Sequence, residues 1–260
     1  MSDLTIILPL KDRFLLTKRW ISFAKIYYQE FNILILDGSK NNEVENYFEK
    51  NKIYKDLNIQ YIKYQYDETV KKYFKKLSNG MLNISTEFSA LVDNDDFFNP
   101  ICLKKSVDFL KKNTEFSTCG GQIIQFRYNN EVLNFYRGNK YTSNNGNTPL
   151  SRLEKEVTHK QSGPLFYDVH RTKQIQKTYK MLHEINTNEL QFVEIFPQFI
   201  DCLNGKNKKL DELYLIREIQ LKESANRDYF EKTGSILNRL IYSDFAHNYK
   251  KLIHYISNHY

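Results

Sequence analysis

Strand-like apolar runs alternate with helix-like stretches through the first 112 residues, and this alternation limits the folds that the chain can adopt. The apolar runs cover residues 4–10, 31–39, 59–66 and 87–92, and helical spacing of apolar residues fills 14–28, 42–51, 68–85 and 99–112. Such alternation is typical of βαβ units, in which parallel strands form a sheet with helices on both faces. We therefore predict an α/β fold.

The second half of the chain has longer strand-like segments and more polar turns. We expect two strands within 116–138 around an Asn-Asn turn, a polar loop at 139–149, a strand at 163–171, a helix at 188–206 with a kink at Pro197, and a strand at 211–220. Together the two halves predict one Rossmann-like domain with a mixed, mainly parallel sheet. Its expected divisions are residues 1–112, 113–230 and a C-terminal helical tail at 231–260.

Composition narrows the class of protein. Of the 260 residues, 41% are hydrophobic and 15% aromatic, which is enough for a substantial core. The three cysteines, Cys102, Cys119 and Cys202, form no CxxC pair, which argues against a disulfide framework or a structural zinc site. The first residues do not resemble a signal peptide, and no apolar run reaches the roughly 20 residues that span a bilayer. We expect a cytoplasmic protein.

The net charge of +7 favours an anionic partner, such as nucleotide phosphates, an acidic glycan or a membrane surface. The basic residues are spread along the chain and match no nucleic-acid-binding motif, so we expect no nucleic-acid partner. The basic, tyrosine-rich tail is expected to pack across the sheet or in a homodimer interface. Peripheral contact with the inner face of a membrane, where lipid-linked acceptors reside, is the alternative.

Three aspartates, Asp93, Asp95 and Asp96, stand within four positions directly after the fourth apolar run. Ligands of parallel α/β sheets bind at the carboxyl ends of the strands, where this motif is expected to lie. Clustered carboxylates repel one another unless a cation neutralises them, and Mg²⁺ or Mn²⁺ prefers oxygen ligands together with substrate phosphates. The motif therefore predicts a divalent-metal site for a diphosphate. A helix-capping acidic turn is the alternative.

Several segments of the first half resemble one enzyme family. The first strand ends in "ILPLKDR", the second ends in "LDGS", and "KKLSNGMLNISTEFSALVDNDD" resembles a segment that leads into an Asp-x-Asp (DxD) motif. Over residues 4–112 the chain is therefore similar to GT-A glycosyltransferases of the family-two type. The resemblance implies a metal-dependent, inverting transfer of a sugar from a nucleotide-sugar donor, and we expect a UDP-sugar.

The resemblance also implies roles for individual residues. Asp93 and Asp95 would hold a Mn²⁺ or Mg²⁺ ion on the donor diphosphate. His170, which is expected to end a strand as the aspartates do, is a further candidate for the metal, for a phosphate contact or for a plain polar strand end. The residues expected to contact the nucleotide are Pro9, Lys11, Asp12, Arg13, Asp37, Lys76, Asp93 and Asn94.

An inverting transfer needs a general base that takes the proton of the acceptor hydroxyl, and the resemblance implies that this base lies in the second half. Glu194 is the first candidate, because its neighbours are apolar and would shield it from water. Glu189 and Asp168 follow it. An exposed glutamate on a helix surface is the alternative interpretation of Glu194.

The expected acceptor is a glycan or a lipid-linked glycoconjugate, as in the biosynthesis of surface polysaccharides. A nucleotidyltransferase acting on sugar phosphates is a second hypothesis. That class commonly has a Gly-rich phosphate loop after the first strand, whereas "LPLKDRF" has no glycine. A catalytically inactive binding module with a GT-A-like fold is a third hypothesis, because the residues do not identify the base.

Overall fold

The computed structural model describes residues 2–129, 132–137, 140–159, 163–219 and 243–259. The strands are β1 (Leu4–Leu10), β2 (Asn32–Asp37), β3 (Asn58–Lys63), β4 (Phe88–Leu91), β5 (Asp96–Phe98), β6 (Phe116–Asn129), β7 (Val132–Arg137), β8 (Val169–Arg171) and β9 (Lys206–Glu218). The helices are α1 (Phe14–Tyr27), α2 (Glu43–Lys50), α3 (Val70–Met81), α4 (Pro100–Lys112), α5 (Pro149–His159), α6 (Thr172–Glu184), α7 (Phe192–Asn204) and α10 (Ser243–His259), with 3₁₀ turns η1 (Ile53–Lys55) and η2 (Leu165–Tyr167).

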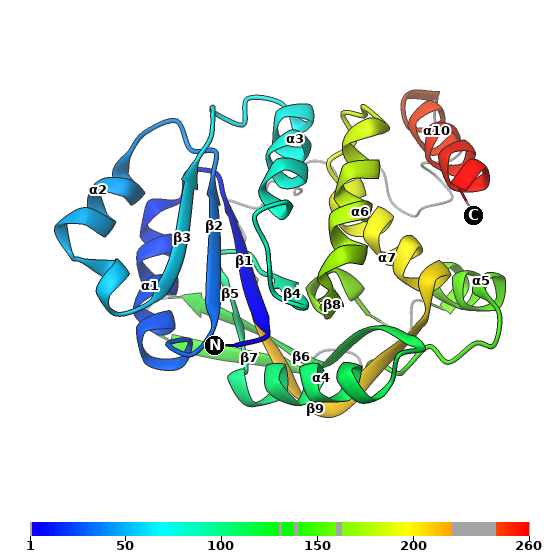
Figure 1. The fold of residues 1–260 in the computed structure, drawn as a ribbon, viewed down its shortest axis with the longest axis horizontal. Coiled ribbons are helices and arrows are strands. Elements are labelled where there is room, and N and C mark those ends of the chain that lie inside the picture. Colours follow the sequence, from blue (N-terminus) through cyan, green and yellow to red (C-terminus); the bar gives the residue numbers. More distant parts are fainter. Residues whose placement is uncertain (1, 130–131, 138–139, 160–162, 220–242, 260) are drawn as a thin grey trace.

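All nine of these strands belong to one mixed sheet with helices on both faces (Figure 1). The strand order is β3-β2-β1-β4-β8-β6-β9-β5, and β7 pairs with β6. In the first half, β1 pairs in parallel with β2 and β4, and β2 pairs in parallel with β3. The parallel βαβ units predicted for this half are confirmed. The last residues of three strands, Leu10, Asp37 and Lys63, lie in one row at the carboxyl edge of the sheet.

The second half joins the sheet with reversed strands. β8 is antiparallel to both β4 and β6, β5 is antiparallel to β9, and β6 is parallel to β9. The strand predicted at 163–171 is wrong over most of its length, because residues 165–167 form η2 and only three residues form β8. Turn hydrogen bonds from Tyr167 N to Pro164 O and from Asp168 N to Leu165 O replace the expected ladder.

Other elements differ in extent from the prediction. The short strand β5 in the first half and the helices α5 and α6 in the second were not expected, and the last strand begins at Lys206 rather than at residue 211. Asn130 of the expected Asn-Asn turn, the end of the predicted strand at residue 220 and positions 231–242 of the tail lie outside the described residues. The helix predicted at 188–206 is found as α7, which is shorter at both ends, with Pro197 inside it and Gly205 as its C-cap.

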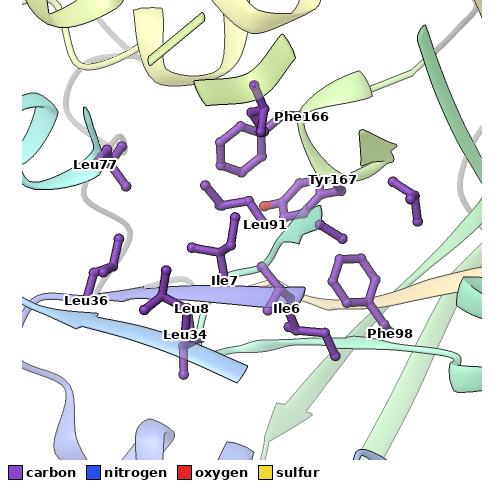
Figure 2. Close-up of a cluster of buried hydrophobic side chains, with 14 of the residues drawn as sticks. Ile6, Ile7, Leu8, Leu34, Leu36, Leu77, Leu91, Phe98, Phe166 and Tyr167 are labelled. Atoms are coloured by element: carbon purple, nitrogen blue, oxygen red, sulfur yellow. The ribbon is translucent and has the colours of Figure 1, made fainter. Parts of the chain in front are cut away.

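One apolar core lies against the parallel strands and joins both halves of the chain. All seven residues of β1 are buried, as expected for a strand with helices on both of its faces. Figure 2 shows the side chains of Ile6, Ile7 and Leu8 among those of neighbouring strands, with Phe166 and Tyr167 of η2 above them. Because η2 packs on this core, it lies beside the loop that follows β4.

The predicted tail helix is found as α10, at the end of the molecule where α5, α6 and α7 also lie (Figure 1). Tyr249 and Leu252 are buried, and the ring of Tyr249 packs edge-on against Phe192 of α7 with centroids 5.0 Å apart. Tyr255 also donates a hydrogen bond to Glu184 of α6. Among the described residues, none of the helices has the length and apolar content needed to cross a bilayer.

Candidate active site

A cavity of about 520 Å³ opens at the carboxyl edge of the parallel strands. Its walls come from the end of β1, the start of α3, the loop between β4 and β5, the start of α7 and the end of β9. Seven residues expected at a site line it: Pro9, Lys11, Arg13, Asp93, Asn94, Asp95 and Glu194. Six others do not: Asp12, Asp37, Lys76, Asp168, His170 and Glu189. The sheet-edge rule therefore located the cavity, and it was less accurate for single side chains.

The three aspartates after β4 converge in this cavity. One oxygen of each of Asp93, Asp95 and Asp96 lies within 4.8 Å of the others. Groups from distant parts of the chain contact them. Tyr167 Oη donates to Asp93 Oδ2 at 3.1 Å, and Arg13 Nη2 donates to Asp95 Oδ2 at 2.6 Å. Their convergence depends on elements from both halves of the chain.

Asp96 is the deepest of the three and faces β9. Its Oδ1 accepts a hydrogen bond from the backbone N–H of Glu218 at 3.1 Å, and its Oδ2 lies 3.4 Å from Arg217 Nε. Arg217 also lies over the ring of Tyr167, with 5.0 Å between the guanidinium carbon and the ring centroid. Sequence reasoning missed Arg217, because its partner lies 121 residues earlier and no local pattern connects them.

The cluster carries excess negative charge. Burial, and then repulsion by Asp95, raise the pKa of Asp93 to about 6. Burial also raises the pKa of Asp96 well above its usual value, although Arg217 opposes the shift. Burial lowers the pKa of Arg217, but Tyr167 and the carboxylates of Asp96, Glu194 and Asp93 outweigh burial and raise it. Arg13 and Arg217 therefore offset only part of the repulsion between these carboxylates.

The three carboxylates offer oxygen ligands that suit a hard divalent cation. Asp96 Oδ2 is buried and accepts no hydrogen bond from the described residues. Seven acidic and three basic residues line the cavity, so its formal charge is 3 − 7 = −4 although the chain as a whole carries +7. They are Asp67, Glu68, Asp93, Asp95, Asp96, Glu194 and Glu218 against Lys11, Arg13 and Arg217. Carboxylate oxygens of this kind are typical ligands of Mg²⁺ and Mn²⁺.

The loop after β1 is held in an unusual backbone conformation. Asp12 and Arg13 both have positive φ, 58° and 59°, which costs free energy for residues other than glycine. Ser39 compensates by accepting from Asp12 N at 2.7 Å, and the Asp12 carboxylate accepts from Lys40 N at 3.1 Å. Asp12 therefore shapes the turn outside the cavity, whereas Arg13 lines it.

Asp37 is completely buried, and hydrogen bonds use both of its carboxylate oxygens. Oδ1 accepts from Ser39 N at 2.7 Å, and Oδ2 accepts from Tyr61 Oη at 2.6 Å and from Lys63 Nζ at 3.2 Å. Burial raises its pKa, but the bonds from Ser39 and Tyr61 and the charge of Lys63 outweigh burial and lower it. In this structure Asp37 supports the cavity wall and does not line it.

Lys76 forms a buried ion pair with Asp67, and it also donates to Leu10 O at 2.7 Å. Burial raises the pKa of Asp67 and lowers that of Lys76, while each partner opposes the shift of the other. Asp67 lines the cavity, and its Oδ1 is buried without a hydrogen bond from the described residues. Sequence reasoning missed Asp67. The sheet-edge rule, applied to the third strand as to the others, would have found it.

Glu194 lies in the first turn of α7 and is half-buried at the wall of the cavity. Among the described residues, none donates a hydrogen bond to its carboxylate or forms an ion pair with it. Pro197 removes the N–H that would bond to Val193 O, and Tyr179 Oη donates to that carbonyl at 3.4 Å instead. Glu189 is buried outside the cavity, with Oε1 accepting from Gln191 N at 3.3 Å.

Asp168 and His170 lie away from the cavity in buried ion pairs. Lys209 Nζ is 2.6 Å from Asp168 Oδ1, and Asp201 Oδ2 is 3.4 Å from His170 Nδ1. The Asp201 carboxylate raises the pKa of His170 although burial opposes it. The direction of β8 explains this placement. Because β8 is antiparallel to β4, His170 pairs with Ser89 within the sheet and not with the acidic loop at its carboxyl edge.

The fold matches solved structures. S. aureus TarS residues 1–349 in complex with UDP-GlcNAc has a TM-score of 0.55 and 17% identity over 99% of this chain and 72% of that chain. The complex of the same TarS fragment with UDP has a TM-score of 0.52 and 18% identity. A longer TarS chain has a TM-score of 0.54 at 16% identity, and this chain covers 43% of it.

This chain has the GT-A fold seen in TarS. The fold class expected from the sequence is thereby confirmed. No protein-family model and no curated protein sequence matches this chain. At 15–18% identity the likeness extends to the fold, and the chain spans less than half of the longer TarS chain.

We predict that Asp168 stabilises the fold through Lys209. Lys209→Met should reduce the free energy of unfolding by about 3–5 kcal/mol, because it leaves a buried carboxylate without its counterion. The double variant Lys209→Met/Asp168→Leu should recover most of this loss. Urea denaturation measures both values. A single variant as stable as the parent protein would contradict this role.

We predict that Asp93 makes the stability of the ion-free protein fall as pH rises from about 4 to 6. In that window the folded protein binds more protons at Asp93 than the unfolded chain does, because its folded-state pKa is raised to about 6. At pH 7 Asp93→Asn should therefore be more stable than the parent protein by about 1–2 kcal/mol, a value reduced for partial exposure.

Denaturation with urea in EDTA at pH 4, 5, 6 and 7 measures this difference. The exposed Asp108→Asn is the matched control and should follow the parent protein at every pH. If Asp93→Asn is less stable than the parent at pH 7, repulsion within the cluster does not dominate its electrostatics.

Proposed function

We propose that this chain is a metal-dependent, inverting glycosyltransferase that transfers a sugar from a UDP-sugar to a glycan or lipid-linked acceptor. One observation carries this proposal: a single cavity contains the aspartate cluster, three basic side chains and, on α7, the half-buried carboxylate of Glu194. The TarS structures, which share the fold, are complexes with UDP and UDP-GlcNAc, and they support a nucleotide-sugar donor.

In this proposal the two halves of the chain bind different parts of the reaction. Pro9 at the end of β1, Lys11 and Arg13 in the loop after it, and Asn94 would contact the nucleotide. Asp12, Asp37 and Lys76 would support them from behind. Asp67 Oδ1 is buried and accepts no hydrogen bond from the described residues, so it suits an N–H group of the nucleotide's pyrimidine ring. The acceptor would enter from the side of α7, which carries Glu194.

Glu194 would act as the general base. Its carboxylate accepts no hydrogen bond from the described residues, so it is available to take the proton of an acceptor hydroxyl. The deprotonated oxygen then attacks the anomeric carbon from the face opposite the diphosphate, and the bond to the diphosphate breaks with inversion. Lys11, Arg13 and Arg217 line the same cavity and would stabilise the charge that develops on the departing diphosphate.

Asp93 and Asp95, with Asp96 beside them, would hold a Mn²⁺ or Mg²⁺ ion, which when bound neutralises charge on the diphosphate. The −4 formal charge of the cavity supports this requirement, because a diphosphate alone would be repelled. A cytoplasmic location is part of the proposal, and so is contact with the inner face of a membrane if the acceptor is lipid-linked.

We predict that Asp95→Asn loses metal-dependent nucleotide binding while it keeps its fold. In the parent protein Mn²⁺ should increase the affinity for UDP, and the variant should lose at least about tenfold of that increase, since a carboxylate ligand is replaced by a neutral amide. Calorimetric titration of UDP with and without MnCl₂ measures it, with Asp108→Asn as the control. An unchanged effect of Mn²⁺ in Asp95→Asn would show that Asp95 does not bind the metal ion.

We predict that Glu194→Gln lowers turnover by about 10²–10⁴, as expected for loss of a general base. Affinity for UDP should stay nearly constant, because the base acts on the acceptor. The assay follows UDP release from UDP-GlcNAc and other UDP-sugars with an acceptor present, and the exposed Glu49→Gln is the matched control. Near-normal turnover in Glu194→Gln would show that Glu194 is not the general base.

The rival functions differ in measurable products. A catalytically inactive module would bind UDP with Mn²⁺ but would not release UDP from any UDP-sugar, even slowly to water. A nucleotidyltransferase would instead form pyrophosphate from a nucleoside triphosphate and a sugar phosphate. Either result, obtained with folded parent protein, would replace the proposed glycosyl transfer.

A further inference from the structure

The ion pair between Arg13 and Asp95 blocks part of the aspartate cluster. Arg13 Nη2 lies 2.6 Å from Asp95 Oδ2, and both side chains line the cavity. They are partly accessible, with exposed fractions of 27% for Arg13 and 13% for Asp95. The Arg13 guanidinium is therefore paired with an oxygen of Asp95, the carboxylate that binds the divalent ion under the proposed function.

Both cations are attracted to the same carboxylate, so they compete for it. A partly exposed ion pair is weak, and displacing it reduces the affinity of a competitor by up to about fivefold. Such a barrier would be small compared with the combined attraction of a divalent ion and a diphosphate. It would still weaken the binding of a metal ion that arrives without a nucleotide.

The geometry of Arg13 permits its side chain to leave Asp95 while its backbone stays in place. Arg13 O accepts hydrogen bonds from Leu16 N at 3.1 Å and from Thr17 N at 3.2 Å, and these bonds fix the residue at the start of α1. Asn94 Nδ2, at 3.4 Å, contacts the same oxygen. The backbone is thus anchored independently of the contact between the guanidinium and Asp95.

The guanidinium also has unused hydrogen-bonding capacity. Arg13 Nε is buried and donates to no acceptor among the described residues. Arginine presents its N–H groups in a planar fork that matches two phosphate oxygens, and bonds of this type between charged groups are among the stronger hydrogen bonds in proteins. A diphosphate in the cavity would supply the acceptors that Arg13 lacks.

We propose that the Arg13 guanidinium pairs with Asp95 when no ligand is bound. When a metal–nucleotide complex binds, Arg13 moves to the diphosphate, so that the divalent ion and the nucleotide bind cooperatively. The inference rests on the proposed function. Arg13 then both weakens the binding of free metal ions and binds the donor. After the exchange, each charge has an opposite partner: Asp95 pairs with the metal ion and Arg13 pairs with a phosphate.

Mn²⁺ binding, followed by electron paramagnetic resonance with and without UDP, tests this exchange. In Arg13→Gln, Mn²⁺ should bind about 2- to 5-fold more tightly than in the parent protein when UDP is absent, because the competitor is gone. UDP should bind at least about tenfold more weakly when Mn²⁺ is saturating, because a charged hydrogen bond is lost. The cooperativity between Mn²⁺ and UDP should therefore decrease.

Two further variants make the result specific. Arg13→Asn should behave as Arg13→Gln does, and asparagine tolerates the positive φ of this position better, so agreement between them excludes a folding effect. Lys25→Gln removes the same charge from α1 at the surface pair with Asp56 and should leave both affinities unchanged.

The outcomes separate the two proposals. If the Arg13 variants bind Mn²⁺ no more tightly than the parent protein without UDP, Arg13 does not compete for Asp95 and the exchange is wrong, while the metal site stands. If the parent protein binds no Mn²⁺ with or without UDP, the metal-dependent function itself is wrong, and the exchange is wrong with it.

Discussion

Repulsion among three carboxylates at the carboxyl edge of the sheet is the constraint on which the site depends. The parallel strands bring Asp93, Asp95 and Asp96 to that edge, and the pKa of Asp93 rises to about 6 because the cluster is crowded and buried. Arg13 in the loop after β1 and Arg217 in β9 offset part of the negative charge. Such sites commonly reduce stability in return for function.

Much of the surrounding structure positions these side chains. Buried pairs such as Asp67–Lys76 and Asp168–Lys209 support the strand ends and the sheet behind the cavity. Tyr167 reaches Asp93 because η2 packs on the apolar core above β4 (Figure 2). The second half of the chain therefore contributes directly to the charge balance of a site whose central motif lies in the first half.

The sequence predicted the first half well, because β1, β2 and β3 are each followed by a helix and polar residues at strand ends identify the edge where ligands bind. It failed where the deciding partner is remote. Asp168 and His170 looked like site residues, yet Lys209 and Asp201 hold them in buried pairs, and the reversed direction of β8 has no local signal. Arg217 was missed for the same reason.

The account's central claim is that the aspartate cluster and the cavity around it bind a divalent ion together with a nucleoside diphosphate. Crystals grown with MnCl₂ and UDP, measured at the manganese absorption edge, test it most directly. We expect an anomalous peak about 2–2.4 Å from carboxylate oxygens of Asp93 and Asp95, with the diphosphate beside it in the cavity. A manganese peak elsewhere, or UDP bound outside this cavity, would contradict the account.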